Sequence, residues 1–177
     1  KSLFMVSGYY TTSTITPNNI TINLAYGVRA KSTWTTFDTD TTKSFTVPDA
    51  FRFGVVKNTN TSTIYTSFSS AISAASTDNV LHVWAWTYNE NIVVNKGVSI
   101  IGNSTATSKI NGGTGDYAIE VKSDGVTIKN LTLNGATDSL LYAGNYDNLK
   151  VENVVMTASS SNYGIYFDRT SDTTITS

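Results

Sequence analysis

The sequence lacks cysteine and contains a single histidine, His82. Without cysteine the chain can have no disulfide scaffold, no thiolate metal site and no cysteine nucleophile. One histidine also excludes a cluster of histidine metal ligands and a Ser-His-Asp triad within one chain. We therefore expect no metal site, no cofactor and no catalytic residue.

Charged residues are also scarce, at 14% of the chain against about 25% in typical soluble domains. The 12 basic and 13 acidic residues give a net charge of −1, so no positive surface is available for a nucleic acid backbone. No apolar run approaches the roughly 20 residues that span a bilayer, and we expect no membrane insertion. Serine, threonine and asparagine are abundant instead, which favours an extracellular or cell-surface location.

What the chain does contain is a repeat of β-type sequence. The segment Gly125–Leu133 is followed 23 residues later by a close copy, Asn148–Met156, and Asn130 falls on Asn153. A looser copy, Gly97–Gly102, lies upstream. Short apolar runs that recur about every 20 to 30 residues, with Gly and Asn at the turns, are typical of a solenoid of stacked β-coils.

The segment from about 67 to 76 has a different pattern. Phe68, Ala71, Ile72 and Ala75 follow the spacing of one helix face, and Ser67 is a suitable N-cap residue. A short amphipathic helix directly before the repeats would cover the core of the first coil. We therefore expect residues 64–177 to form a parallel β-helix with a capping helix at its start.

Residues 1–63 contain only β-type runs, such as Leu3–Val6, Ile20–Tyr26 and Phe51–Val56, separated by polar stretches. Residues 57–63 have the composition of a polar connector. We expect a small β-rich N-terminal region that either covers the solenoid or makes assembly contacts. The predicted fold class is therefore all-β.

The opening of the solenoid resembles that of right-handed parallel β-helix proteins, the pectin-lyase-like superfamily. The resemblance is carried by the helix Phe68–Ala75, by Thr87–Val94 and by Asn95–Gly102, which resembles a Lys-x-Ile-x-Ile-x-Gly stretch of that family. Trp86 departs from the pattern, because a glycine is common there. The resemblance covers about residues 64–177. It implies the fold and carries little information about function.

In the resembling family, inward asparagines at equivalent coil positions stack as a ladder, which implies a structural ladder of Asn130 and Asn153. A buried amide without a partner costs about 1 to 3 kcal/mol, so these side chains should be hydrogen-bonded. Asn19, Asn60 and Asn103 begin Asn-x-Ser/Thr sequons and are candidate glycosylation sites, although several sequons arise by chance in such a sequence.

Aromatic side chains alternate at His82, Trp84, Trp86 and Tyr88, so they would share one face of a strand. This row could be covered by the N-terminal region, contact another subunit, or stack on sugar rings. Covering is the favoured interpretation, and the other two stay open.

Two groups of charged residues are candidates for catalysis or calcium binding: Asp116, Glu120 and Asp124, and Asp168, Arg169 and Asp172. Paired carboxylates could hydrolyse glycosidic bonds, and calcium with an arginine could serve polysaccharide elimination. Neither group matches a catalytic motif of the resembling family. Turns and local ion pairs are therefore the favoured interpretation.

The segment Thr173–Ser177 repeats the strand phase of the preceding coils, so we expect the solenoid to be incomplete at its C-terminus. An uncovered β-edge needs pairing, either by further sequence or by another chain. The leading hypothesis is a non-enzymatic extracellular structural protein, a homo-oligomeric or polymeric subunit of a microbial surface layer or filament. The alternative is a carbohydrate-binding or polysaccharide-degrading module that binds glycans. An adhesin passenger domain is a third.

Overall fold

The computed structural model describes residues 56–157 and 163–177. Within them the chain is mostly β-structure with one short helix, and it forms a β-solenoid of about four turns, which confirms the predicted fold class. The runs expected at Leu3–Val6 and Ile20–Tyr26, most of Phe51–Val56, and Asn19 lie outside the described residues.

The secondary structure alternates short strands with tight corners. In chain order the elements are β1 (Val56–Asn58), β2 (Thr63–Tyr65), α1 (Phe68–Ala74), β3 (Val80–Val83), β4 (Trp86–Asn89), β5 (Ile92–Val94), β6 (Ser99–Gly102), β7 (Ser108–Asn111), β8 (Tyr117–Val121), β9 (Thr127–Asn134), β10 (Ser139–Gly144), β11 (Lys150–Thr157), β12 (Tyr163–Asp168) and β13 (Thr174–Thr176).

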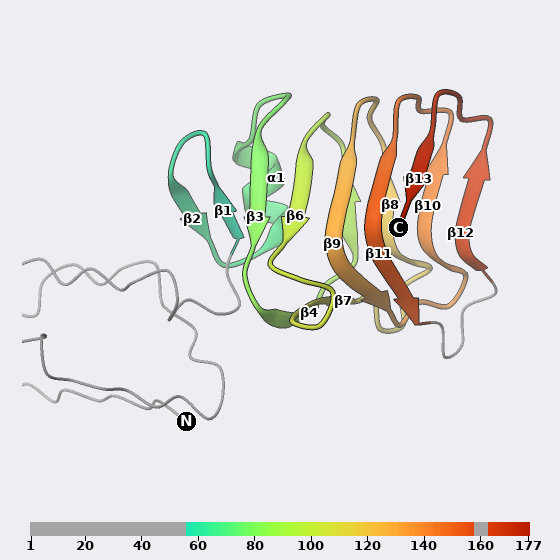
Figure 1. The fold of residues 1–177 in the computed structure, drawn as a ribbon, viewed down its shortest axis with the longest axis horizontal. Coiled ribbons are helices and arrows are strands. Elements are labelled where there is room, and N and C mark those ends of the chain that lie inside the picture. Colours follow the sequence, from blue (N-terminus) through green and yellow to red (C-terminus); the bar gives the residue numbers. More distant parts are fainter. Residues whose placement is uncertain (1–55, 158–162) are drawn as a thin grey trace, which may run out of the picture.

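Two sheets run along the solenoid. The larger contains the order β13-β11-β9-β6-β3-β1-β2, with β4 and β7 joined to it through β9, and the smaller has the order β12-β10-β8-β5. All pairings are parallel except those of β1, which is antiparallel to both β2 and β3. Figure 1 shows β3, β6, β9 and β11 side by side, with β8, β10 and β12 forming the other wall. Each coil therefore rests on the equivalent strands of the one before.

The core is a stack of aliphatic side chains in register. Leu81 pairs with Ile100, Ile100 with Ile128, and Ile128 with Val151, and all four are buried. Burying each such side chain contributes about 1.5 to 3 kcal/mol. Ile175 is the next member of the stack and is 55% exposed, because no described strand lies beyond β13.

The start of the solenoid is closed by the expected helix and by a hairpin that was not expected. In α1, Ser67 is the N-cap and its hydroxyl accepts a hydrogen bond from the Ser70 amide, while Phe68, Ala71 and Ile72 are buried. Residues 57–63 are not a connector, because β1 and β2 form an antiparallel hairpin on the edge of β3. The buried Asn58 side chain organises the turn, since its Oδ1 accepts from the amides of residues 60 and 61. A polar sequence thus extends the larger sheet upstream of the expected boundary at 63.

Two charged residues that flank β5 hold the two ends of α1. Glu90 Oε2 accepts a hydrogen bond from the Phe68 amide at the first turn, at 3.0 Å. Lys96 Nζ donates to the carbonyls of Ser73 and Ala75 at the last turn, at 2.6 Å each. An acid at the N-terminus and a cation at the C-terminus both complement the helix dipole. The first coil therefore carries its own attachment points for the helix.

This clamp makes Lys96 a stability residue. We predict that Lys96→Met, which keeps most of the side-chain volume, lowers the free energy of unfolding by about 1.5 to 3 kcal/mol because charge-assisted hydrogen bonds to two carbonyls are lost. Urea unfolding followed by circular dichroism measures the loss. Lys122→Met, at an exposed ion pair on β8's C-terminal side, is the matched control and should lose much less. Equal losses in the two variants would contradict the clamp.

Candidate functional site

The aromatic residues singled out in the sequence do not share one face, which corrects that prediction. β3 ends at Val83 and β4 begins at Trp86, so a corner at Trp84 and Ala85 interrupts the alternation. Trp84 and Tyr88 are buried, at 5% and 3% exposure, and Trp86 packs partly buried against the core. Alternation in a solenoid sequence does not report a corner, because the chain changes direction without a break in pattern.

Tyr88 and His82 have structural partners. The Tyr88 hydroxyl donates to the Trp84 carbonyl at 2.9 Å, and its ring meets Phe68 of α1 edge to face at 5.1 Å. His82 Nε2 lies 2.6 Å from Asn103 Oδ1, and its ring meets Trp84 edge to face. Tyr88 thus helps seat the capping helix, and only His82 and Trp86 of the row keep surface that a ligand could contact.

A groove of about 400 Å³ lies between α1 and β5. Ser69, Ile72 and Ser73 line it from the helix, and residues 91–93, Asn95 and Lys96 line it from β5 and the residues beside it. Lys96 is its charged group and already binds the helix end. The groove therefore presents hydroxyl and amide groups to a ligand, while the Lys96 ammonium group is bound to the helix.

Asn130 and Asn153 lie next to each other on β9 and β11, and Asn153 Nδ2 donates to Asn130 Oδ1 at 3.0 Å. Both residues have positive φ, 55° and 47°, which bends each long strand at a corner. Asparagine tolerates this conformation better than other side chains. Asn153 is exposed because β13 pairs with β11 only as far as Glu152. Within the described residues, Asn153 is therefore the last member of this ladder.

The ladder begins at Asn130 for a steric reason. Gly102 occupies the equivalent corner of the preceding coil, directly after Ile101, which pairs with Lys129. A Cβ at Gly102 would collide with the Asn130 carbonyl oxygen and would lie 2.9 Å from Ser108 Cβ. Ser108 fills this corner instead, and its hydroxyl donates to the Val83 carbonyl and accepts from the Asn103 amide.

The structure contains a second amide ladder that was not predicted from the sequence. Asn89, Asn111 and Asn134 are paired in register on β4, β7 and β9, and Asn111 Nδ2 donates to Asn89 Oδ1 at 2.9 Å. Their separations of 22 and 23 residues repeat the period of the solenoid. This spacing could have identified them, but the chain is so rich in asparagine that other pairs repeat at similar intervals.

Carboxylates also bridge coils. Asp124 Oδ1 accepts from the Asp147 amide, and Asp147 Oδ1 accepts from the Ser171 amide, both at 2.8 Å. On the outer face of the larger sheet, Lys129 Nζ contacts Glu152 Oε2 at 2.6 Å. The hydrogen bond from Lys129, and then its charge, lower the pKa of Glu152. Each of these acids is engaged with the equivalent position of the neighbouring coil.

The other candidate acids are dispersed. Glu120 pairs with Lys122 at 3.0 Å, and Asp168 pairs with Arg169 at 3.2 Å. Asp116 Oδ1 accepts from the Thr137 hydroxyl. Within residues 56–157 and 163–177, no three His, Cys, Asp or Glu residues are grouped as metal ligands. Of the acids predicted as two possible groups, Glu120 and Asp168 therefore form local ion pairs, while Asp116 and Asp124 bind groups of the neighbouring coil.

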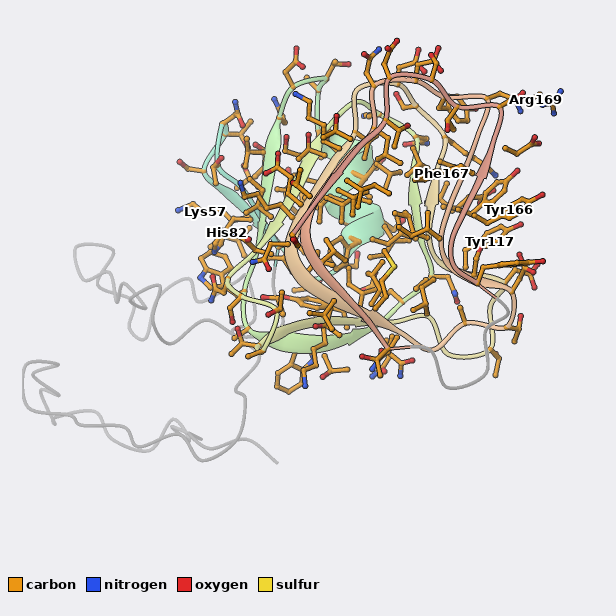
Figure 2. The ribbon with its side chains drawn as sticks, turned by 45° about the vertical axis from the view of Figure 1, so that its right-hand side comes forward. Lys57, His82, Tyr117, Tyr166, Phe167 and Arg169 are labelled. Atoms are coloured by element: carbon orange, nitrogen blue, oxygen red, sulfur yellow. The ribbon has the colours of Figure 1, made fainter. Side chains whose placement is uncertain are left out.

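Tyrosines form a column that the sequence prediction also missed. Tyr117, Tyr142 and Tyr166 lie on β8, β10 and β12, with ring centroids 4.6 and 5.8 Å apart and ring planes 12° apart in both pairs. Tyr163 joins at 5.4 Å from Tyr166. Figure 2 shows Tyr117 and Tyr166 on the opposite side of the solenoid from Lys57 and His82. Burial first, and then the charges of Asp138 and other nearby groups, raise the pKa of Tyr117.

The two remaining candidate residues are exposed sequon asparagines, each of which also makes a hydrogen bond. Asn60 Oδ1 accepts from the Val80 amide at 2.8 Å, and Asn103 Oδ1 contacts His82. No described helix is long and apolar enough to cross a membrane. Comparison with protein-family models and with curated proteins finds no match. The assignment of function therefore rests on the geometry of the chain itself.

Two substitutions at Asn130 can distinguish the contribution of its positive φ from that of its side-chain hydrogen bond. Asn130→Ala should lower the free energy of unfolding by about 2 to 3 kcal/mol, because it loses a hydrogen bond and places a Cβ at positive φ. Asn130→Gly keeps the backbone conformation and should lose only about 1 kcal/mol. Urea unfolding measures both. If glycine proves as harmful as alanine, the backbone explanation fails.

The Lys129–Glu152 pair predicts a pH effect. Because the pKa of Glu152 is lower in the folded chain, its contribution is present above the unfolded pKa and is lost as pH falls through the folded one. The stability difference between wild type and Glu152→Gln should therefore shrink between about pH 5 and pH 3. Thermal melts across this range measure the stability difference. The double variant Lys129→Met/Glu152→Gln should show the same pH dependence of stability as Glu152→Gln. Parallel curves for wild type and Glu152→Gln would refute the effect.

Proposed function

We propose that the chain is a non-enzymatic structural β-solenoid module that builds an extracellular assembly, such as a microbial surface layer or filament, by joining copies through its ends. The observation that carries the proposal is the use of polar side chains between coils. Asn153 binds Asn130, Asp147 accepts from Ser171, and Lys129 binds Glu152. These amide, carboxylate and amine groups form hydrogen bonds and ion pairs between neighbouring coils.

The edge of the last coil supports assembly through the ends. Within the described residues, β12 pairs only with β10, and β13 only with β11. Tyr163, Tyr166, Val155 and Ile175 are 43% to 55% exposed on these strands. Exposed apolar side chains beside strand edges that no described strand covers favour pairing with further β-structure, either of the same chain or of another copy. A second copy whose other end meets this edge makes a heterologous contact, which propagates as a filament or sheet.

The proposal also includes a cellular location, glycosylation, a superfamily and a role for the N-terminal region. An extracellular location agrees with the low charge and the high content of serine, threonine and asparagine, and the exposed Asn60 and Asn103 are accessible to glycosylation. Membership of the pectin-lyase-like superfamily is supported by the capping helix followed by parallel coils. The role of the N-terminal residues as an assembly or covering layer belongs to the same proposal.

The alternative, a carbohydrate-binding module, has less exposed aromatic surface for stacking on sugars than the sequence predicted. With Trp84 and Tyr88 buried, Trp86 and His82 are the members of the row left to meet a sugar. Binding of polysaccharides that is lost in Trp86→Ala, with folding retained, would favour this alternative over the structural role.

The proposed assembly has a direct test. We predict that the full chain associates with rising concentration, as measured by light scattering after size-exclusion chromatography and by negative-stain microscopy. Ile175→Asp should weaken association at least about tenfold, because burying an isoleucine contributes about 1.5 to 3 kcal/mol.

Ile101→Asp is the matched control, since Ile101 lies on the outer face in mid-solenoid between His82 and Lys129. It should associate as wild type does. Chains that stay monomeric at every concentration, or equal weakening in the two variants, would overturn assembly through this edge.

A further inference from the structure

The tyrosine column places four phenol rings in contact across three adjacent coils. Tyr142 lies between Tyr117 and Tyr166, with ring centroids 4.6 and 5.8 Å away and nearly parallel planes. Tyr142 and Tyr166 are also direct register partners on β10 and β12. Neighbouring rings therefore come from strands that the sheet already holds side by side.

The position of Tyr142 is built into the sheet. Its hydroxyl lies over Gly144, two residues along the same strand, where any Cβ would collide with it. Glycine thus leaves the space in which the central ring of the column rests. At the end of the column, Tyr163 and Tyr166 are 51% and 43% exposed, so a soluble oxidant can reach the rings.

We propose that this column is a site of oxidative cross-linking, in which Tyr142 joins Tyr117 or Tyr166 as dityrosine. Each of two phenols loses one electron and one proton, and the resulting phenoxyl radicals couple through a new bond between ring carbons ortho to the hydroxyls. The two ortho hydrogens move to the phenol oxygens as the rings regain aromaticity. The oxidant is a peroxide acting through a haem peroxidase, and one hydrogen peroxide takes the two electrons and two protons to become two water molecules.

Acidic residues lie close to Tyr117 in the sequence and in the structure. Asp116 directly precedes it, Glu120 follows on the same strand, and Asp138 acts on its charge from the neighbouring coil. Burial first, and then these and other nearby charges, raise the pKa of Tyr117, so the phenol enters the reaction protonated and gives up its proton only as the electron leaves.

The cross-link would have the effect of a disulfide in a chain that has no cysteine. Tyr117 and Tyr142 are 25 residues apart in the sequence, and Tyr142 and Tyr166 are 24 apart. A covalent bond that closes a loop of this length restricts the unfolded chain and so raises stability. The consequence is independent of the proposed assembly, because the bond joins coils of one molecule.

The test treats the full chain with horseradish peroxidase and hydrogen peroxide at high dilution. We expect dityrosine fluorescence, an intact mass lower by two hydrogen atoms without dimer formation, and a raised melting temperature. Peptide mapping should find Tyr142 joined to Tyr117 or Tyr166. The same treatment in urea should scatter the links among other tyrosines.

Tyr142→Phe keeps the ring and the stack but cannot form a phenoxyl radical. It should lose every link between coils and the gain in melting temperature, while a Tyr163–Tyr166 link on one strand remains. Tyr65→Phe is the matched control and should behave as wild type. Links that are unchanged in Tyr142→Phe, links only between molecules, or oxidation without coupling would each overturn the proposal.

Discussion

Parallel stacking of coils in register is the constraint on which the rest of this structure depends. Each residue in a paired strand has as its neighbour a residue of the next coil, 19 positions on between β3 and β6, 28 between β6 and β9, and 23 between β9 and β11. In several columns like side chains meet like, whether they are aliphatic, amide or aromatic. Residues that attract their own kind are stable in such a stack, whereas a column of one charge would repel itself.

The same constraint explains how the solenoid begins. Parallel pairing propagates until a strand of opposite direction interrupts it, and β1 is that strand at the start. The capping helix then covers the aliphatic core, held by Glu90 and Lys96 at its two ends. Hydrogen bonds from the first coil therefore fix a terminal element that could not be stable alone, since a helix of seven residues is too short to persist in water.

Elements with local signals were predictable from the sequence, and those defined by corners were not. The helix was found because its cap and apolar spacing lie within ten residues, and β9 and β11 because their sequences repeat. The corner at Trp84 was missed because side-chain alternation continues through it. The hairpin at 56–65 was missed because its buried Asn58 is polar. The ladder through Asn111 and the pair Tyr142–Tyr166 follow the strand register, whereas Tyr117 is three residues out of register with Tyr142, and a single asparagine or tyrosine does not show which way it faces.

Register also determines what a free edge requires. Among the described residues, Asn153, Tyr166 and Ile175 are the last members of their columns, and all three side chains are exposed. These groups differ in chemistry but share one spacing, which is set by the strands beneath them. A surface that satisfies all three must present an amide partner, an aromatic ring and an aliphatic side chain at the same intervals. A β-structure with the same coil geometry meets that demand, whereas a flat or unrelated surface satisfies one column and leaves the others unpaired.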